Sequence, residues 1–227
     1  MSNIRWLGHA SFQLELAGRI ILIDPWLSTD GKRERVVAPA CSAKDIKRCD
    51  LILLTHEHFD HASKADVGDI VSRTFAHVVG PAETLAELGD AVPARQRTNA
   101  REGDRFNLLG VDIEVTEARH PQSVHPVGYV LRTPEGKSVY HAGDTYEFYT
   151  MNRFSPDLAL LPIGGTFTLD VLSAVSTVKQ LRCKRVIPMH YNTFDVIKAD
   201  VEDFARRVKK DTKAEPVVLR VGDSVEF

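Results

Sequence analysis

The beginning of the chain alternates between apolar and polar residues with a period of two. Phe12, Leu14 and Leu16 are separated by single polar residues, which is the pattern of a strand with one buried face. Residues 4–7 precede this stretch and residues 19–23 follow it after a short turn, a spacing that favours a hairpin. The chain is therefore predicted to begin with a run of strands.

The rest of the chain mixes strand and helix patterns. Further strands are predicted at 50–54, 75–79, 111–118, 127–132, 138–141, 158–162, 185–188 and 217–221, and helices at 63–73, 81–88, 147–154, 170–181 and 198–209. Residues 28–47 are predicted to form a loop with one short helical turn, and residues 90–105 to form turns and short extended pieces. Each half runs from strands into strand–helix alternation. We therefore predict one domain, residues 1–227, built from two αβ halves that face each other across their sheets.

The composition argues against several classes of protein. The chain has 227 residues, 43% of them hydrophobic and 26% charged, and a formal net charge of -2, so a nucleic-acid-binding surface is not expected. Three cysteines are too few for a disulfide framework and fit a reducing compartment. The sequence shows no signal peptide and no apolar run long enough to span a bilayer. We expect a cytoplasmic protein that acts on a small molecule, without nucleic-acid or membrane partners; a homo-oligomer is left open.

A cluster of histidines and acids follows the apolar run at residues 51–54. His56, His58, Asp60 and His61 lie within six residues. Residues two apart in an extended chain point the same way, so His56 and His58 can bind one ion. Asp60 and His61 can face a second ion after the chain turns. Imidazole and carboxylate suit zinc, iron or manganese, whereas a structural zinc finger would use thiolates at this density.

Further candidate ligands follow other predicted strands. His120 comes after the strand at 111–118, Asp144 after the strand at 138–141, and His190 after the strand at 185–188. Because strand ends gather at a sheet edge, we expect seven side chains to converge: His56, His58, Asp60, His61, His120, Asp144 and His190. With one bridging carboxylate they can hold two divalent ions about 3.5–4 Å apart. Such a set leaves a coordination position open, which is typical of a catalytic site.

The order of these residues resembles the metallo-β-lactamase superfamily, in which His-x-His-x-Asp-His is followed by a lone His, a Gly-Asp and a last His. Five longer stretches are similar to its small single-domain metal-dependent hydrolases, which are related to the ascorbate-phosphate lactonases. They are Trp6-Leu7-Gly8-His9, Ile21-Leu22-Ile23-Asp24-Pro25, Tyr140-His141-Ala142-Gly143-Asp144-Thr145, Leu160-Leu161-Pro162-Ile163-Gly164 and Ile187-Pro188-Met189-His190-Tyr191-Asn192-Thr193. The resemblance implies an α+β fold, the four-layer αββα sandwich, and a hydrolase.

The resemblance also implies which residues hold which ion. One metal would be held by His56, His58 and His120, the second by Asp60, His61 and His190, and Asp144 would bridge them. Zinc is the first expectation for both ions. Manganese, iron and nickel are alternatives, because His and Asp sites accept these ions according to supply.

A few positions depart from the family pattern. Glu57 and Phe59 stand where family members often have glycine, and both are expected to alternate away from the ligands. Gly165 replaces an acid, and Asp170 adds one. These last two departures are expected to affect contacts around the metals or with the substrate, rather than metal binding.

Five other residues are candidates for supporting roles. Asp24 can accept the free N–H of a metal-bound histidine, or form a turn before a proline. His9 can contact a ligand or the substrate, or it can be a hydrogen-bonded corner residue. His141 can orient the bridging acid or a leaving group, or be structural. Tyr191 and Asn192 can stabilise an oxyanion, or pack the loop after His190.

The favoured function is a metal-dependent hydrolase that uses a metal-bound hydroxide at a dinuclear site. The hydroxide would attack a carbonyl or phosphoryl centre of a small ester, lactone or phosphoester. Asp60 or Asp144 would pass a proton to the leaving group. One alternative is a di-iron oxidoreductase on the same fold, although there an acid replaces the histidine found here at His58. A non-catalytic metal-binding protein is the other alternative.

Overall fold

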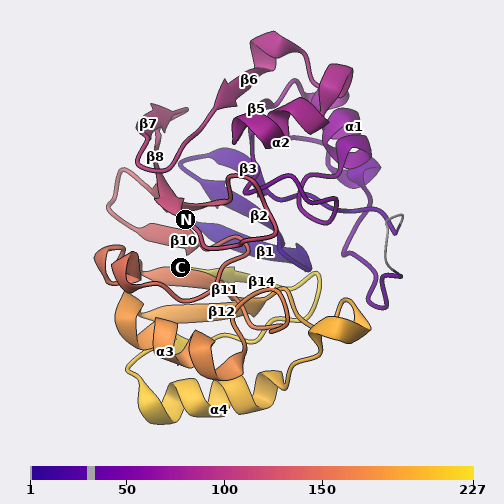
Figure 1. Ribbon diagram of the computed structural model, residues 1–227. Coiled ribbons are helices and arrows are strands. Elements are labelled where there is room, and N and C mark those ends of the chain that lie inside the picture. The colour runs from indigo at the N-terminus through magenta and orange to yellow at the C-terminus, as the bar shows by residue number, and fades with distance from the viewer. Residues whose placement is uncertain (1, 30–33) are drawn as a thin grey trace.

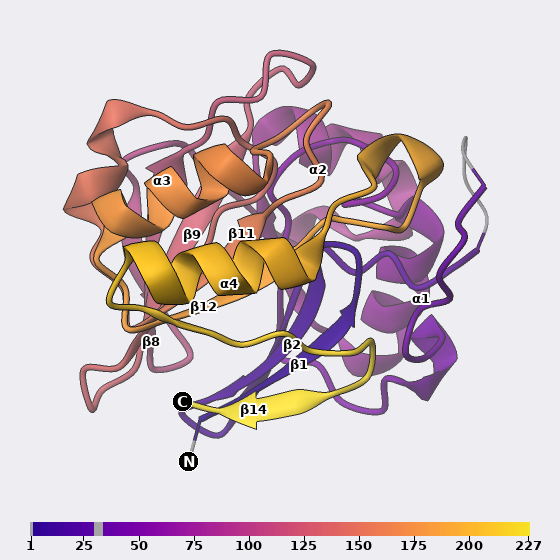
Figure 2. The same ribbon diagram turned by 90° about the horizontal axis from the view of Figure 1, so that it is seen from below.

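The computed structural model describes residues 2–29 and 34–227, so residue 1 and positions 30–33 of the predicted loop at 28–47 lie outside the described residues. In this part of the chain two seven-stranded sheets face each other, with helices on their outer faces (Figure 1). The helices are α1 (Lys64–Thr74), α2 (Ala82–Glu87), α3 (Val171–Leu181) and α4 (Val201–Asp211). The first two cover one sheet and the last two cover the other (Figures 1 and 2). The predicted αββα sandwich of the α+β class is confirmed.

The first sheet takes nearly all of its strands from the first half of the chain. Its strands are β1 (Asn3–Gly8), β2 (Ser11–Leu16), β3 (Arg19–Ile23), β4 (Leu51–Leu53), β5 (His77–Gly80), β6 (Arg97–Asn99) and β14 (Ser224–Glu226). They lie in the order β14-β1-β2-β3-β4-β5-β6. Neighbours from β14 to β3 are antiparallel, and those from β3 to β6 are parallel.

The second sheet repeats this arrangement with later strands. Its strands are β7 (Arg105–Leu108), β8 (Val111–Glu117), β9 (Val127–Arg132), β10 (Ser138–His141), β11 (Leu158–Pro162), β12 (Arg185–Met189) and β13 (Glu215–Pro216), in the order β13-β12-β11-β10-β9-β8-β7. Antiparallel pairing links β7 to β10, and parallel pairing links β10 to β13. Short 3-10 helices lie at Ala43–Asp45, Gly89–Ala91, Ala94–Gln96, Tyr149–Arg153 and Asp195–Ile197.

Two large apolar cores hold the layers together. The main core includes Leu14 of the first sheet, Tyr129 of the second sheet and Phe204 of α4, all fully buried. The other core joins Ile52 on the outer face of the first sheet to Val67 of α1. Burial of apolar area on this scale is the dominant stabilising term of the fold. The apolar cores lie between and outside the sheets, so polar side chains can occupy the segments that follow the strand ends.

The predicted strand at 217–221 is wrong. Val217 donates its N–H to the Val186 carbonyl, and the chain then leaves the second sheet. At the far end, Gly222 donates to the Trp6 carbonyl and so joins the first sheet. Val217 and Val221 pack against the main core, which gives the segment the apolar composition of a strand although it crosses between sheets.

Two other expectations need correction. The predicted helix at 147–154 is only a 3-10 helix at Tyr149–Arg153, and strand β7 was not predicted. The residues of β7 alternate between half-buried and exposed, so the strand has little of the apolar signal that marks a buried one.

The departures at positions 165 and 170 have local structural roles. Asp170 is the N-cap of α3, where its Oδ1 accepts a hydrogen bond from the Ser173 N–H at 2.8 Å. Gly165 has a φ of 64°, a left-handed conformation that glycine adopts without strain. Both residues shape the turn that leads into α3.

None of the helices in the described residues has the length and apolar composition needed to span a bilayer.

The carboxylate of Asp66 in α1 anchors the loop that follows β3. Its Oδ2 accepts hydrogen bonds from the Leu27 N–H at 2.8 Å and from the Ser28 N–H and hydroxyl at 3.0 Å. We expect Asp66→Ala to lower the free energy of unfolding by about 2–3 kcal/mol, because buried donors lose a charged acceptor. Asp69→Ala on the same helix removes only a surface ion pair and should cost about 0.5 kcal/mol or less. Urea denaturation of both variants tests this, and equal losses would contradict it.

Candidate metal centre

All seven predicted ligands lie at one edge of the sandwich, on segments that follow strands. His56, Asp60 and their neighbours come after β4, while His120, Asp144 and His190 come after β8, β10 and β12. Their donor atoms form three groups, within each of which the atoms lie less than 4.8 Å apart: His56, His58 and His120; His9, Asp60, His61 and His190; and His56, His61 and Asp144. The ligand set divides between the two sheets, so the site exists only where the sheets meet.

The first group has the spacing of a metal site. The Nδ1 atom of His58 lies 3.1 Å from Nε2 of His56 and 3.3 Å from Nε2 of His120. Tetrahedral zinc with Zn–N bonds of 2.0–2.1 Å separates its nitrogen ligands by about 3.3 Å. The three nitrogens therefore converge at the distance that a shared ion requires.

Outer hydrogen bonds fix which nitrogen of each ring carries the proton. His58 places Nε2 3.1 Å from the Gln122 carbonyl, and His120 places Nδ1 3.2 Å from the Phe167 carbonyl. Because a carbonyl can only accept, each of these nitrogens must be the N–H donor. The other nitrogen of each neutral ring is then free of a proton and points into the group, as a metal ligand must.

Asp24 fixes the remaining rings on this side of the site. Its carboxylate accepts hydrogen bonds from the Thr55 hydroxyl at 2.6 Å and from Nδ1–H of His61 at 2.8 Å. Because the Thr55 hydroxyl donates to Asp24, it accepts from Nδ1–H of His56 at 3.0 Å. The Nε2 atoms of His56 and His61 are therefore directed inward. The contact between Asp24 and His61 is the one expected of an acid that orients a ligand.

The pKa values of the two buried histidines His56 and His61 are shifted in opposite directions. Burial, with the charge of His61, holds the pKa of His56 well below its usual range, so that ring is neutral. Burial also opposes charge on His61, but Asp144 and Asp24 outweigh it and raise the pKa of His61 well above its usual range. In the absence of an ion, a proton on His61 thus supplies the positive charge that these carboxylates attract.

Asp144 lies between the two sets of ligands. Its Oδ2 is 3.1 Å from Nε2 of His190 and 4.0 Å from Nε2 of His56, and its Oδ1 is 3.4 Å from Nε2 of His61. Within the described residues, Oδ1 and Nε2 of His61 are buried without a hydrogen-bond partner. Burial disfavours the carboxylate, but the charges of His190 and His61 hold the pKa of Asp144 well below its usual range. Asp144 is thus an ionised carboxylate next to a buried ring nitrogen that has no hydrogen-bond partner in the part of the chain that the structure describes. This is the environment expected of a carboxylate that would bridge two metal ions.

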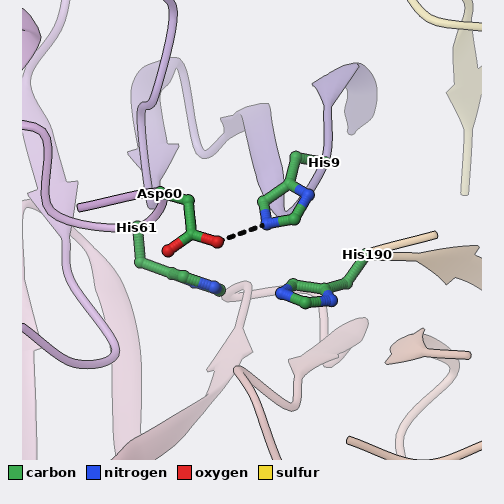
Figure 3. Close-up of side chains that lie close together, drawn as sticks. All are labelled: His9, Asp60, His61 and His190. Atoms are coloured by element: carbon green, nitrogen blue, oxygen red, sulfur yellow. Dashed lines mark hydrogen bonds and ion pairs between the residues drawn. The ribbon is translucent and has the colours of Figure 1, made fainter. Parts of the chain in front are cut away.

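His9 joins the second group through Asp60 (Figure 3). Nε2 of His9 lies 3.2 Å from Oδ2 of Asp60, and its ring centroid lies 4.0 Å from that of His190. Burial and the charge of His190 lower the pKa of His9 to about 3, so the ring is neutral and donates through Nε2–H. The pKa of Asp60 is also below its usual range, because bonds and charges from His9 and His61 outweigh burial. His9 therefore orients an ionised Asp60.

Three site residues have left-handed backbone. His9, Asp24 and His190 have φ values of 55°, 47° and 54°, and each lies just after a strand. This conformation is uncommon for residues other than glycine and costs free energy. It turns the chain sharply at the end of the strand, and the side chain then enters the site.

Some of the predicted supporting residues do not reach the site. The ring of Tyr191 stacks on Trp6, with centroids 5.6 Å apart, and Asn192 accepts a hydrogen bond from the Ala199 N–H at 2.9 Å. These two residues pack the loop after β12, as their alternative interpretation stated. His141 places Nε2 2.9 Å from the Ala10 carbonyl and accepts from the Gly143 N–H at 3.1 Å, so it supports the turn before Asp144.

A cleft of about 620 Å³ opens onto the ligands, and the sequence patterns did not identify its walls. Its polar lining residues are His58, Asp60, His120, Gln122, Asp144 and His190, and its apolar ones are Phe59, Phe167, Phe194 and Ile197. The expectation that Phe59 faces away from the ligands is wrong. Residues 59–61 form a turn, closed by a hydrogen bond from the His61 N–H to the His58 carbonyl, so the alternation of a strand ends there.

Comparison with known proteins places this arrangement in a family. The protein-family model described as "Beta-lactamase superfamily domain" matches residues 3–190 of the sequence. The chain belongs to the beta-lactamase superfamily. Within this superfamily it is 40% identical to a UPF0173 metal-dependent hydrolase of Pyrobaculum aerophilum, over 97% of this chain and 98% of that protein. It is also 40% identical to a UPF0173 metal-dependent hydrolase of Thermofilum pendens, over the full length of both chains.

A solved structure agrees with this assignment to the superfamily. Igni18, described as a novel metallo hydrolase from Ignicoccus hospitalis KIN4/I, matches with a TM-score of 0.81 and 33% identity, covering 100% of this chain and 99% of that chain. The resemblance to the metal-dependent hydrolases of the beta-lactamase superfamily is confirmed.

We expect Asp24→Asn to weaken metal binding about 10–100-fold, the range seen when a partner that orients a ligand is lost. Oδ2 of Asp24 accepts from His61 and the Thr55 hydroxyl, and Oδ1 accepts from the Thr55 N–H at 2.8 Å. An amide has only one acceptor oxygen, so its NH₂ group must face a donor on one of these two sides. Asparagine tolerates the left-handed backbone at this position, so the fold should persist. Competition with a chromophoric chelator measures the affinity. Asp112→Asn, an exposed change on β8, is the control, and equal affinities would refute the role of Asp24.

The carboxylate of Glu57 fixes the position of residues 122–124, the loop segment whose Gln122 carbonyl accepts from His58. It accepts hydrogen bonds from the Ser123 hydroxyl at 2.8 Å and the Val124 N–H at 2.9 Å, next to the Gln122 carbonyl that orients His58. We expect Glu57→Ala to weaken metal binding at the first group by up to about tenfold and to leave binding at the second group unchanged, because Glu57 acts on His58 only through residues 122–124.

Stepwise metal titration followed by calorimetry separates the two sites in this variant. Glu83→Ala is the matched control, since Glu83 is a partly exposed acid that pairs with His125 at 3.0 Å and lies outside the three groups of donor atoms. Equal weakening of both sites, or of neither, would show that Glu57 does not act through His58.

Proposed function

We propose that this cleft hydrolyses a small ester, lactone or phosphoester at a dinuclear metal site. The observation that carries the proposal is the convergence of His56, His58 and His120, whose inward nitrogens are left free of protons by outer hydrogen bonds. Asp144 lies between this group and the second one. Family membership among metal-dependent hydrolases supports the reaction class. When bound, divalent ions would supply hydroxide at neutral pH and a Lewis acid for the developing oxyanion.

The chain offers a complete set of ligands for two ions. The first would be held by His56, His58 and His120, the second by Asp60, His61 and His190, with Asp144 shared. Zinc suits these nitrogen and oxygen donors, and manganese, iron or nickel would also be accepted. No thiolate competes, since none of the metal-binding groups in the described residues includes a cysteine.

Asp60 is placed to move the proton. Hydrolysis forms a bond from the water oxygen to the acyl or phosphoryl centre and breaks the bond to the leaving oxygen, which gains a proton from the water. Asp60 lines the cleft, and its Oδ2 is oriented by His9, so the carboxylate can take that proton and return it to the leaving group. Asp144 is the less accessible candidate, because both of its oxygens face imidazoles.

The test combines metal content with turnover. We expect about two metal equivalents per chain, loss of activity after chelation and recovery when an ion is restored. His58→Ala should bind about one equivalent fewer, because it removes the nitrogen at the centre of the first group.

The control for this experiment is His125→Ala, a change to an exposed histidine that pairs with Glu83. It should keep the metal content and activity of the natural protein. Turnover that survives chelation would contradict the proposal. Two bound equivalents without hydrolysis of any substrate class would favour a non-catalytic metal-binding protein.

A further inference from the structure

We propose that the cleft selects substrates with an apolar, uncharged acyl group, and therefore carboxylic esters or lactones rather than phosphoesters. This inference rests on the proposed hydrolase function and narrows its substrate class. It is carried by the walls of the cleft, which are separate from the metal ligands.

The wall is an aromatic cluster distinct from the two large cores. Trp26, Phe194 and Ile197 are buried together, and Phe59 and Phe167 pack against them partly exposed. The Trp26 ring lies 5.7 Å from that of Phe59 and 5.6 Å from that of Phe194, between centroids. These residues come from segments that follow different strands, as the ligands do.

The partly exposed rings face the substrate space. Phe59 and Phe167 line the cleft together with the ligands His58 and Asp60. A cleft of about 620 Å³ lies within the range of small-molecule sites, which are predominantly apolar with a few polar groups that fix orientation. A substrate whose reacting carbonyl lies at Asp60 and His58 would place its acyl chain against these rings.

Among the described side chains that line the cleft, none is a lysine or arginine that could bind a phosphate, so only the proposed metal ions would attract one. The titratable side chains of this lining are the imidazoles and the carboxylates of Asp60 and Asp144. Arg35 touches the wall but is not among the lining residues; its guanidinium stacks 4.0 Å from the Trp26 ring and donates to the Trp26 carbonyl at 2.8 Å. Phosphate sites usually add arginine, lysine or a helix N-terminus to any metal ion, because the ions contact only some of the phosphate oxygens. A dianion would instead lose hydration beside phenyl rings, which is costly.

The experiment compares substrates that share one leaving group. Metal-loaded protein is assayed with p-nitrophenyl acetate, butyrate, hexanoate, the negatively charged succinate half-ester, and phosphate. We expect kcat/KM to rise roughly two- to fourfold per added methylene, as burial of an alkyl chain predicts. Hexanoate should exceed succinate and phosphate by more than about tenfold.

Variants assign this preference to the wall. Phe59→Arg and Phe167→Arg should flatten the dependence on chain length and raise the relative rate with succinate. Leu172→Arg is the matched control, because Leu172 is an exposed apolar residue on α3 and should leave the preference unchanged.

A binding measurement without metal separates specificity from catalysis. Calorimetric titration of chelated protein with 4-phenyl-2-butanone, a neutral ketone, should show binding that Phe59→Arg weakens, whereas phenyl phosphate should not bind. Faster hydrolysis of the phosphate than of the hexanoate would overturn the apolar preference and leave the hydrolase standing. Ketone binding that depends on Phe59, without turnover of any ester, would support the preference and contradict the hydrolase. Rates and binding that do not respond to chain length or to Phe59 would refute the inference.

Discussion

The outer hydrogen bonds of His56, His58, His61 and His120 are the constraint on which the centre depends. Neutral imidazoles packed at about 3 Å would pair with one another unless something fixed their protons, and here carbonyls and a hydroxyl do so from outside. Each partner belongs to a loop placed by a different strand, and Asp24 ties two of the rings to the end of β3. The fold therefore determines the chemical form of the ligands as well as their positions.

Charge in the centre is balanced across the two sheets. Asp144 comes from the second sheet, and its oxygens face His61 from the first sheet and His190 from the second. Burying these groups is unfavourable unless they find partners of opposite charge. A metal ion bound there would replace the proton on His61, so metal binding and protonation would compete for the same nitrogen. The stability of the contact between the two sheets would therefore depend on whether the site holds a metal ion.

Periodic segments could be predicted from the sequence, and so could the ligands that follow them. Alternation located β2 and β8, and the spacing of His56, His58, Asp60 and His61 located the site. Prediction failed where backbone direction changes. Tyr191 and Asn192 are adjacent to His190, but left-handed turns at His190 and Asn192 direct them into the loop packing. Phe59 enters the cleft because a turn replaces the strand, and the aromatic wall joins residues that no local pattern connects.

The pairing of β14 with β1 has a consequence for biosynthesis (Figure 2). Until residues 224–226 have left the ribosome, β1 is an unpaired edge that can template pairing with other chains. The first sheet thus cannot be completed from the N-terminal half alone, although that half emerges first. The ligands on its loops must likewise wait for His120, Asp144 and His190. A nascent chain carries an open edge and half a binding site together, and the two are completed only late in synthesis.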